Sequence, residues 1–121
     1  MKSKILVVED DFDLQMLMTK KLTLEGFAVL QATTGQDAID LVKKMPDLVL
    51  LDILLPDIDG LTVLSEIVHD EKTKKIPVII LSNLADSASV EQAAAIGNYE
   101  YLVKAKTDLN TVVARIREKL K

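Results

Sequence analysis

The chain has 121 residues, of which 49% are hydrophobic and 28% are charged, and this size and composition are typical of one globular domain. The formal net charge of -4 supplies no basic face for phosphates, so we expect no nucleic-acid partner. The absence of cysteine excludes disulfides, thiolate metal sites and cysteine nucleophiles, and it fits a reducing cytoplasm. The apolar runs contain about four residues, whereas a membrane-spanning helix needs about 20, so we expect neither a membrane segment nor a secretory leader.

Five short apolar runs, bounded by charged or turn residues, predict strands that are buried on both faces of a sheet. They lie at residues 4–8, 27–31, 48–51, 77–81 and 100–103. The segments that follow them carry apolar residues at helical spacing. These stripes are Leu14, Leu17, Met18 and Leu22; Ala38, Leu41, Val42 and Met45; Leu61, Leu64, Ile67 and Val68; Val90, Ala93 and Ala94; and Leu109, Val112, Val113, Ile116 and Leu120. The alternation predicts an α/β fold, a doubly wound five-stranded parallel sheet with five helices on both faces.

Residues that start and stop helices support these boundaries. Thr34 begins a loose capping box, and Thr107 is expected to cap the last helix. Gly26 and Gly97 lie where helices should end. Because the first strand begins near the amino terminus and the last helix reaches the carboxyl terminus, we expect residues 1–121 to form a single domain without an output domain.

Side chains capable of chemistry follow four of the five predicted strands. They are Glu9, Asp10 and Asp11 after the first strand, Asp52 after the third, Ser82 and Asn83 after the fourth, and Lys104 after the fifth. Because parallel strands end at one edge of a sheet, where open α/β folds bind ligands, we expect these side chains to meet there. Asp52 ends an apolar run, so its charge requires a partner, whereas Asp11 is placed to cap a helix and Asp57 and Asp59 have the pattern of solvated loop acids.

Three of these carboxylates, on Glu9, Asp10 and Asp52, would repel one another unless a cation offset their charge. The available ligands are hard oxygens, and the single histidine, His69, lies in a charged run typical of a surface, so the set favours Mg²⁺ over Zn²⁺. An aspartate beside Mg²⁺, a hydroxyl and a lysine provides the nucleophile, the charge neutralisation and the donors that phosphoryl transfer needs. The pattern therefore predicts an acyl phosphate.

Several segments, taken together and in order, resemble the receiver domain of two-component response regulators. They are Ile5–Asp10, Leu51–Pro56, Gly60, Ile80–Ser82 and Tyr101–Lys104. The resemblance covers the whole chain and is to a stand-alone receiver of the chemotaxis-regulator kind. It implies the flavodoxin-like strand order 2-1-3-4-5, a cytoplasmic location and the function of a phosphorylation-dependent signalling switch.

The resemblance also implies a role for each site residue. Asp52 would be the phosphoacceptor, Asp10 a direct Mg²⁺ ligand, Glu9 a partner through water, the Leu54 carbonyl a further ligand, Ser82 and Lys104 the binders of phosphoryl oxygens, and Tyr101 the switch aromatic coupled to Ser82. Such a protein is not an enzyme with a separate substrate, but a phosphoacceptor that catalyses its own phosphorylation and dephosphorylation. Its implied partners are a sensor histidine kinase or phosphotransfer protein and an unknown downstream protein, and its implied state is a monomer or a weak phosphorylation-dependent dimer.

The chain departs from the family pattern beside the site. Ala105 stands where proline is usual, Lys106 replaces a common aromatic residue, and Asn83 stands at a position for a small residue, where it could partly cover the phosphate. A cis bond before a non-proline residue costs about 2.5–4 kcal/mol, so we predict a trans bond between Lys104 and Ala105.

Two alternative functions remain open. Ala105 and Lys106 would suit a pseudo-receiver, an interaction module that never takes phosphate, although every reactive position is filled. A flavin-binding flavodoxin-like protein would need a phosphate loop rich in Ser, Thr and Gly after the first strand, where this chain has three acids.

Overall fold

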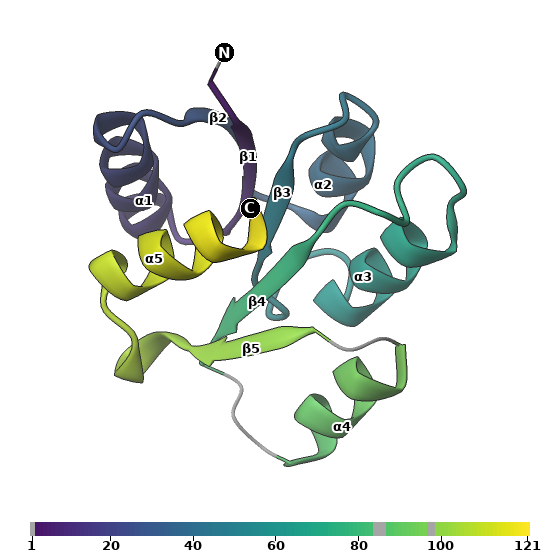
Figure 1. Ribbon diagram of the computed structural model, residues 1–121. Helices are drawn as coiled ribbons and strands as arrows, with labels where there is room; N and C mark the ends of the chain where they lie inside the picture. Colours follow the sequence, from purple (N-terminus) through teal and green to yellow (C-terminus); the bar gives the residue numbers. More distant parts are fainter. Residues whose placement is uncertain (1, 84–86, 97–98) are drawn as a thin grey trace.

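The computed structural model of the chain describes residues 2–83, 87–96 and 99–121 (Figure 1). Its strands are β1 (Lys4–Val8), β2 (Ala28–Ala32), β3 (Leu48–Leu51), β4 (Val78–Ser82) and β5 (Glu100–Val103). Its helices are α1 (Phe12–Leu24), α2 (Gly35–Val42), α3 (Gly60–His69), α4 (Ser87–Ile96) and α5 (Leu109–Lys119), with a short 3₁₀ helix η1 at Lys104–Lys106. The strands form one parallel sheet in the order β2-β1-β3-β4-β5. The predicted α/β fold and its implied strand order are both confirmed.

Each strand alternates its side chains between two layers of helices. In β1, Ile5 and Val7 pack in a core cluster with residues of α1 and α5, whereas Leu6 and Val8 pack in a second cluster with residues of α2, α3 and α4. Figure 1 shows the strands running between these two groups of helices. Because both faces are covered, the central strands are apolar except for Lys4 at the start of β1 and Ser82 at the end of β4, and they therefore stand out in the sequence as short apolar runs.

Two strands begin one residue later than predicted, and the backbone explains the first shift. The N–H of Phe27 donates to Leu22 O at 3.0 Å, so Phe27 closes the end of α1 instead of opening β2. Gly26, with a φ of +96°, makes this turn and confirms the predicted helix stop. The stop predicted at Gly97 lies outside the described residues. In β4, the residue before the strand, Pro77, has no N–H to donate, but its carbonyl accepts from Val49 N–H at 3.0 Å.

Three of the predicted helical stripes are partly wrong. Leu17 of α1 is 54% exposed, and the polar Gln15 takes a buried position on that helix instead. α2 ends at Val42, so Met45, which has a φ of 57° and precedes Pro46, lies outside the helix. In α4, Ala93 is buried but Val90 and Ala94 are exposed.

The helix caps are mostly side chains that precede each helix. Asp11 and Thr34 accept from Leu14 N–H and Asp37 N–H at 3.0 Å each, as predicted. The predicted cap of α5 is wrong, because Asp108, not Thr107, accepts from Thr111 N–H at 2.7 Å. None of the helices in the described part of the chain is long and apolar enough to cross a membrane.

The two loop acids Asp57 and Asp59 are exposed, as predicted, and each also accepts backbone hydrogen bonds. Asp59 caps α3 by accepting from Leu61 N–H at 2.9 Å. Asp57 accepts from Gly35 N–H at 2.7 Å and Gln36 N–H at 3.0 Å, at the start of α2. These bonds tie the segment after β3 to the first turns of two helices. His69 is also exposed as expected, with its Nδ1 2.8 Å from Ser65 O.

Candidate functional site

The carboxyl ends of β1, β3, β4 and β5 bring the predicted site residues to one edge of the sheet. Register pairs Val8 with Leu51, so Glu9 and Asp52 leave neighbouring strands side by side. Register also pairs Ser82 with Val103, which places Ser82 one residue before the level of Lys104. The expectation that these side chains meet is therefore confirmed for the two acids and the lysine, whose contacts are direct.

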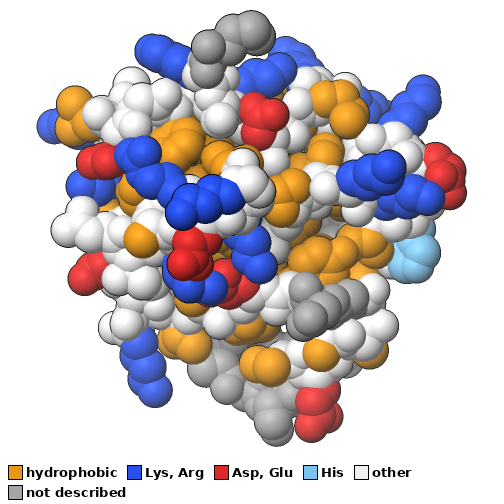
Figure 2. Space-filling view, viewed as in Figure 1, with side chains coloured by type: hydrophobic (Ala, Val, Ile, Leu, Met, Phe, Trp, Pro, Cys, Tyr) orange, Lys and Arg blue, Asp and Glu red, His pale blue; other side chains and the backbone are white. Residues whose placement is uncertain are grey.

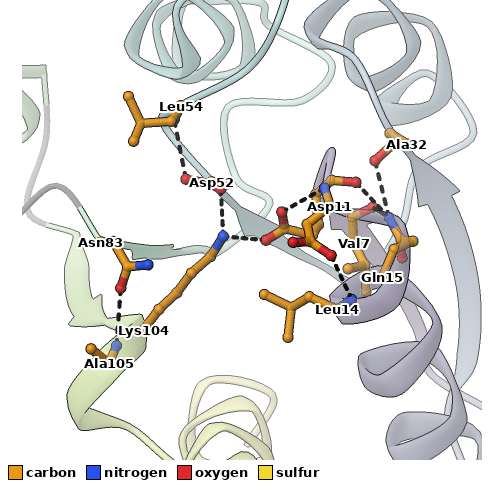
Figure 3. A network of polar contacts seen from close by, with 11 residues as sticks. Val7, Asp11, Leu14, Gln15, Ala32, Asp52, Leu54, Asn83, Lys104 and Ala105 are labelled. Carbon is orange, nitrogen blue, oxygen red and sulfur yellow. Dashed lines mark hydrogen bonds and ion pairs between the residues drawn. The ribbon is translucent and has the colours of Figure 1, made fainter.

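Lys104 is the partner that the buried Asp52 requires. Its Nζ lies 2.6 Å from Asp52 Oδ2 and also forms an ion pair with Glu9 Oε1. Asp52 is 4% exposed and Glu9 is 1% exposed, so the ammonium offsets two carboxylates that water reaches poorly. Figure 3 shows the lysine side chain reaching from the end of β5 toward Asp52.

Burial and ion pairing act in opposite directions on these groups. Burial raises the pKa of Glu9 above its ordinary value, although the Lys104 ammonium and the Asp11 N–H both act to lower it. Burial also lowers the pKa of Lys104, but its bonds to Asp52 and Glu9 outweigh that effect, so the net direction is upward. Lys104 is therefore held in its charged form.

Glu9, Asp10 and Asp52 have the geometry of a cation site. Each offers a carboxylate oxygen, and the three oxygens lie within 4.8 Å of one another. Asp10 is exposed, so the cluster is open to solvent on one side. When all are ionised, one ammonium leaves this group with two more negative than positive charges, and the all-oxygen donor set fits Mg²⁺. The residues therefore fit the divalent ion that the sequence predicted.

The loops that carry these acids are fixed by their own backbone. Asp11 N–H donates to Glu9 Oε2 at 3.0 Å, which turns the Glu9 carboxylate toward the cluster. Leu54 N–H donates to Asp52 Oδ1 at 3.1 Å, so the residue expected to supply a carbonyl ligand lies beside the carboxylate. Gly60 N–H donates to Ile53 O at 2.8 Å and holds the start of α3 against the same segment.

Two further predicted site residues, Ser82 and Tyr101, lie on β4 and β5. Ser82 is buried at the end of β4. Tyr101 is half-buried in β5, pairs in register with Ile80 and packs against the core cluster beneath α2, α3 and α4. Both residues make polar or ring contacts. Register places Ser82 and Tyr101 on the neighbouring strands β4 and β5, and their roles stay predictions.

Two features of the site were not predicted. Gln15 is buried behind Glu9, and its amide donates to backbone carbonyls. Asn83 Oδ1 accepts from Ala105 N–H at 3.0 Å, so this side chain is turned toward the residue after Lys104 (Figure 3). No peptide bond among the described residues is cis, and the prediction of a trans bond between Lys104 and Ala105 is confirmed.

Comparisons with known proteins agree with this geometry. The family model of the response regulator receiver domain matches residues 5–117. The DNA-binding dual master transcriptional regulator RpaA of Synechocystis is 35% identical over 119 residues, which are 98% of this chain and 49% of that protein. The BeF3-activated N-terminal receiver domain of Klebsiella pneumoniae RstA is 29% identical with a TM-score of 0.87, and the match covers 98% of this chain and 99% of that one.

A third comparison supports the fold alone. A CheY-like response regulator receiver domain protein from Methanospirillum hungatei superposes with a TM-score of 0.92 at 24% identity, covering 99% of this chain and 94% of that chain. The chain spans 46% and 49% of the length of the first curated relatives that it matches.

Proposed function

The chain belongs to the response regulator receiver domain family, and from this premise we propose that it is a signalling switch operated by phosphorylation of Asp52. The observation that carries the proposal is the grouping of a buried aspartate, two further acids and a lysine at one edge of the sheet. This grouping supplies a nucleophile and a fixed positive charge, which are the protein groups that phosphoryl transfer requires. A pseudo-receiver, which never takes phosphate, would need neither the nucleophile nor the fixed positive charge.

In the proposed reaction, a carboxylate oxygen of Asp52 attacks the phosphorus of a phosphohistidine or of a small acyl phosphate. The new bond joins that oxygen to phosphorus, and the bond from phosphorus to the donor breaks, with its electron pair leaving on the donor. Glu9, Asp10, Asp52 and the Leu54 carbonyl would hold Mg²⁺, which supplies charge neutralisation at the transferring group. Lys104 and Ser82 would donate to the phosphoryl oxygens.

Lys104 has to change partners during this step. Its ammonium is engaged by Asp52 and Glu9 before the phosphoryl group arrives. Once Asp52 is converted to the acyl phosphate, its carboxyl oxygens carry less charge, whereas the phosphoryl oxygens carry more, so the ammonium would move onto them. The Ser82 hydroxyl would move toward the same oxygens. The Tyr101 side chain would rotate in response and change the surface at β5, where a downstream protein would bind.

The proposed phosphodonor is the phosphohistidine of a sensor histidine kinase or phosphotransfer protein. The first turns of α1, which begin next to the acidic cluster, expose the apolar side chains of Phe12 and Met16, and Phe12 is 72% exposed. Figure 2 shows that hydrophobic side chains also reach the surface between charged groups on the face it presents. Exposed apolar groups beside a reactive centre suit a protein partner better than a free small molecule.

Mass spectrometry of the intact protein after incubation with Mg²⁺ and acetyl phosphate tests the proposal. We expect the wild-type chain to gain one phosphoryl group, and we expect no gain with Asp52→Asn or with excess chelator. Asp59→Asn is the matched control, because it makes the same change in the same loop and keeps an effective helix cap. A wild-type chain that gains nothing, or an Asp52→Asn variant that gains as much, would overturn the proposal in favour of an interaction module.

A further inference from the structure

Gln15 is a buried polar side chain whose amide nitrogen contacts three backbone carbonyls behind the acidic cluster. It is 3% exposed, although it lies on a helix whose other buried residues are apolar. Its Nε2 lies 3.1 Å from Val7 O, 3.1 Å from Ala32 O and 3.3 Å from Glu9 O. Figure 3 shows the Gln15 amide directed at Val7 of β1 and Ala32 of β2. A buried amide that is satisfied in this way holds its neighbours in one arrangement.

The three carbonyls lie at the carboxyl ends of β1 and β2, or one residue beyond. Val7 is the last residue but one of β1, and Ala32 is the last residue of β2. Ala32 O also accepts from Glu9 N–H at 2.9 Å. The peptide groups on both sides of the Glu9 Cα are therefore held, one through Ala32 and the other through Gln15. Glu9 and Asp10, the two residues after β1, carry two of the carboxylates of the cluster.

The orientation of the Gln15 amide is itself fixed from the other end. Thr19 Oγ1 donates to Gln15 Oε1 at 3.2 Å, and Gln31 Nε2 donates to Thr19 Oγ1 at 2.8 Å. Because the amide oxygen accepts from Thr19, the NH₂ group must face the carbonyls. A chain of three polar side chains from β2 and α1 thus ends on the backbone of Glu9.

We propose that Gln15 is a positioning residue for the divalent-ion site, and that it acts by fixing the backbone from which the Glu9 and Asp10 carboxylates project. This inference rests on the proposed function only in assigning a cation to that cluster. Ligand carboxylates bind an ion well only when their separation is held, and groups that hold them typically change metal affinity by 10–100-fold when removed. Without the Gln15 donors, the Glu9 carbonyl loses this bond and the Glu9 backbone keeps only the bond from its N–H to Ala32 O, so the two carboxylates are held less firmly in their common direction.

The test is the dissociation constant of Mg²⁺ alone, measured by calorimetry without a phosphodonor. Gln15→Met keeps the length and the buried volume but removes both donors. We expect its Mg²⁺ dissociation constant to rise about 10-fold. The rate of phosphorylation by acetyl phosphate should fall at low Mg²⁺ and return close to the wild-type rate at saturating Mg²⁺. Thr19→Val, which removes only the bond to the amide oxygen, should shift affinity in the same direction by a smaller factor.

Thr73→Val is the matched control for lost stability. Thr73 is 3% exposed and donates to Ile67 O at 2.7 Å, so Thr73→Val also removes a buried hydrogen bond to a backbone carbonyl. This bond lies before the start of β4, at the edge of the sheet opposite the acidic cluster. We expect Thr73→Val to lower the melting temperature and leave the Mg²⁺ dissociation constant unchanged.

The possible results separate this inference from the proposed function. A Gln15→Met variant with the wild-type dissociation constant, or a Thr73→Val variant with an equal loss of affinity, would overturn the role of Gln15. A wild-type chain that binds Mg²⁺ but gains no phosphoryl group would overturn the proposed function and leave the role of Gln15 standing. A wild-type chain that binds no Mg²⁺ would overturn both.

Discussion

The side chain of Asn83 accepts a hydrogen bond from the backbone N–H of Ala105 at 3.0 Å, and this bond joins the residue after Ser82 to the residue after Lys104. The two groups proposed to bind phosphoryl oxygens therefore lie on segments that are linked directly. A chain with proline after the lysine has no N–H there, so this link depends on the alanine. Asn83 and Ala105, two of the three departures from the family pattern, act together.

A double-mutant cycle tests this link. We expect Asn83→Ala to lower the free energy of unfolding by about 0.5–1 kcal/mol, because one net hydrogen bond is lost. Ala105→Pro should also destabilise, since it removes the donor and disfavours the helical backbone of Lys104 in η1. In the Ala105→Pro background, Asn83→Ala should cost nearly nothing in urea denaturation, because its partner is already absent. Strictly additive losses would show that the bond contributes no stability.

Gly60 allows the start of α3 to lie against the segment after Asp52. A Cβ at residue 60 would lie 2.5 Å from Asp52 O and 2.9 Å from Ile53 O, both of them backbone atoms that cannot turn aside. We therefore expect Gly60→Ala to lower the free energy of unfolding by about 2 kcal/mol and to slow phosphorylation by displacing Asp52.

Gly26→Ala is the comparison, because residue 26 has a φ of +96° but open space around a Cβ. It should destabilise by about 1–2 kcal/mol through backbone strain and leave the phosphorylation rate unchanged. Equal loss of rate in the two variants would contradict the steric explanation at Gly60.

We expect Asp57 to give the stability of the fold a pH dependence on the acid side. Hydrogen bonds from Gly35 N–H and Gln36 N–H, at the start of α2, lower the pKa of Asp57 below its ordinary value of 3.8. A lowered folded-state pKa means that the stabilisation is present above pH 3.8 and is lost as the pH falls through the folded pKa. Chemical denaturation from pH 6 to pH 2 should therefore show a steeper loss of stability for the wild-type chain than for Asp57→Asn.

Asp40→Asn is the control for this effect, because Asp40 is an exposed acid that accepts only from the Gln36 side chain among the described residues. We expect its pH profile to match that of the wild-type chain. Parallel profiles for the wild-type chain and Asp57→Asn would show that the Asp57 bonds do not depend on its charge.

Asp10 is the acid of the cluster with no cation partner in the described part of the chain. Replacing it with asparagine removes one negative charge from a group with an excess of them, so the metal-free chain should gain about 0.5 kcal/mol of stability. The Mg²⁺ dissociation constant should rise at the same time, because a ligand charge is lost. Thermal melts with and without Mg²⁺ measure both effects. The control is Asp13→Asn, which removes an acid in the first turn of α1 and should leave the Mg²⁺-induced shift in melting temperature unchanged.

The strands and the acidic cluster could be predicted because simple rules cover them. Parallel strands buried on both faces are apolar throughout, as β3 is, and their ends meet at one edge, which brings Glu9 and Asp52 together. The burial of Gln15 could not be predicted, because a polar residue in a helix is ordinarily exposed. Nothing in the sequence around residue 15 shows that its amide contacts the carbonyls of Val7 and Glu9, which precede the helix, and of Ala32, which lies 17 residues away. The Asn83 to Ala105 bond joins residues 22 apart in sequence, and its donor is a backbone group that no sequence pattern marks.

Lys104 and Mg²⁺ should compete for the same carboxylates, and a Lys104→Met variant separates their contributions. The ammonium pairs with Glu9 and Asp52, both almost fully buried, so its removal leaves two carboxylates without a protein cation. Breaking a buried pair in this way typically costs 3–5 kcal/mol, and because Asp10 opens the cluster to water we expect a loss of about 3 kcal/mol without metal. Mg²⁺ then has no competitor, so the metal-induced rise in melting temperature should be larger in Lys104→Met than in the wild-type chain. Lys106→Met removes the neighbouring exposed lysine and should change neither quantity. A smaller Mg²⁺-induced shift in Lys104→Met would mean that the ammonium supports metal binding instead of opposing it.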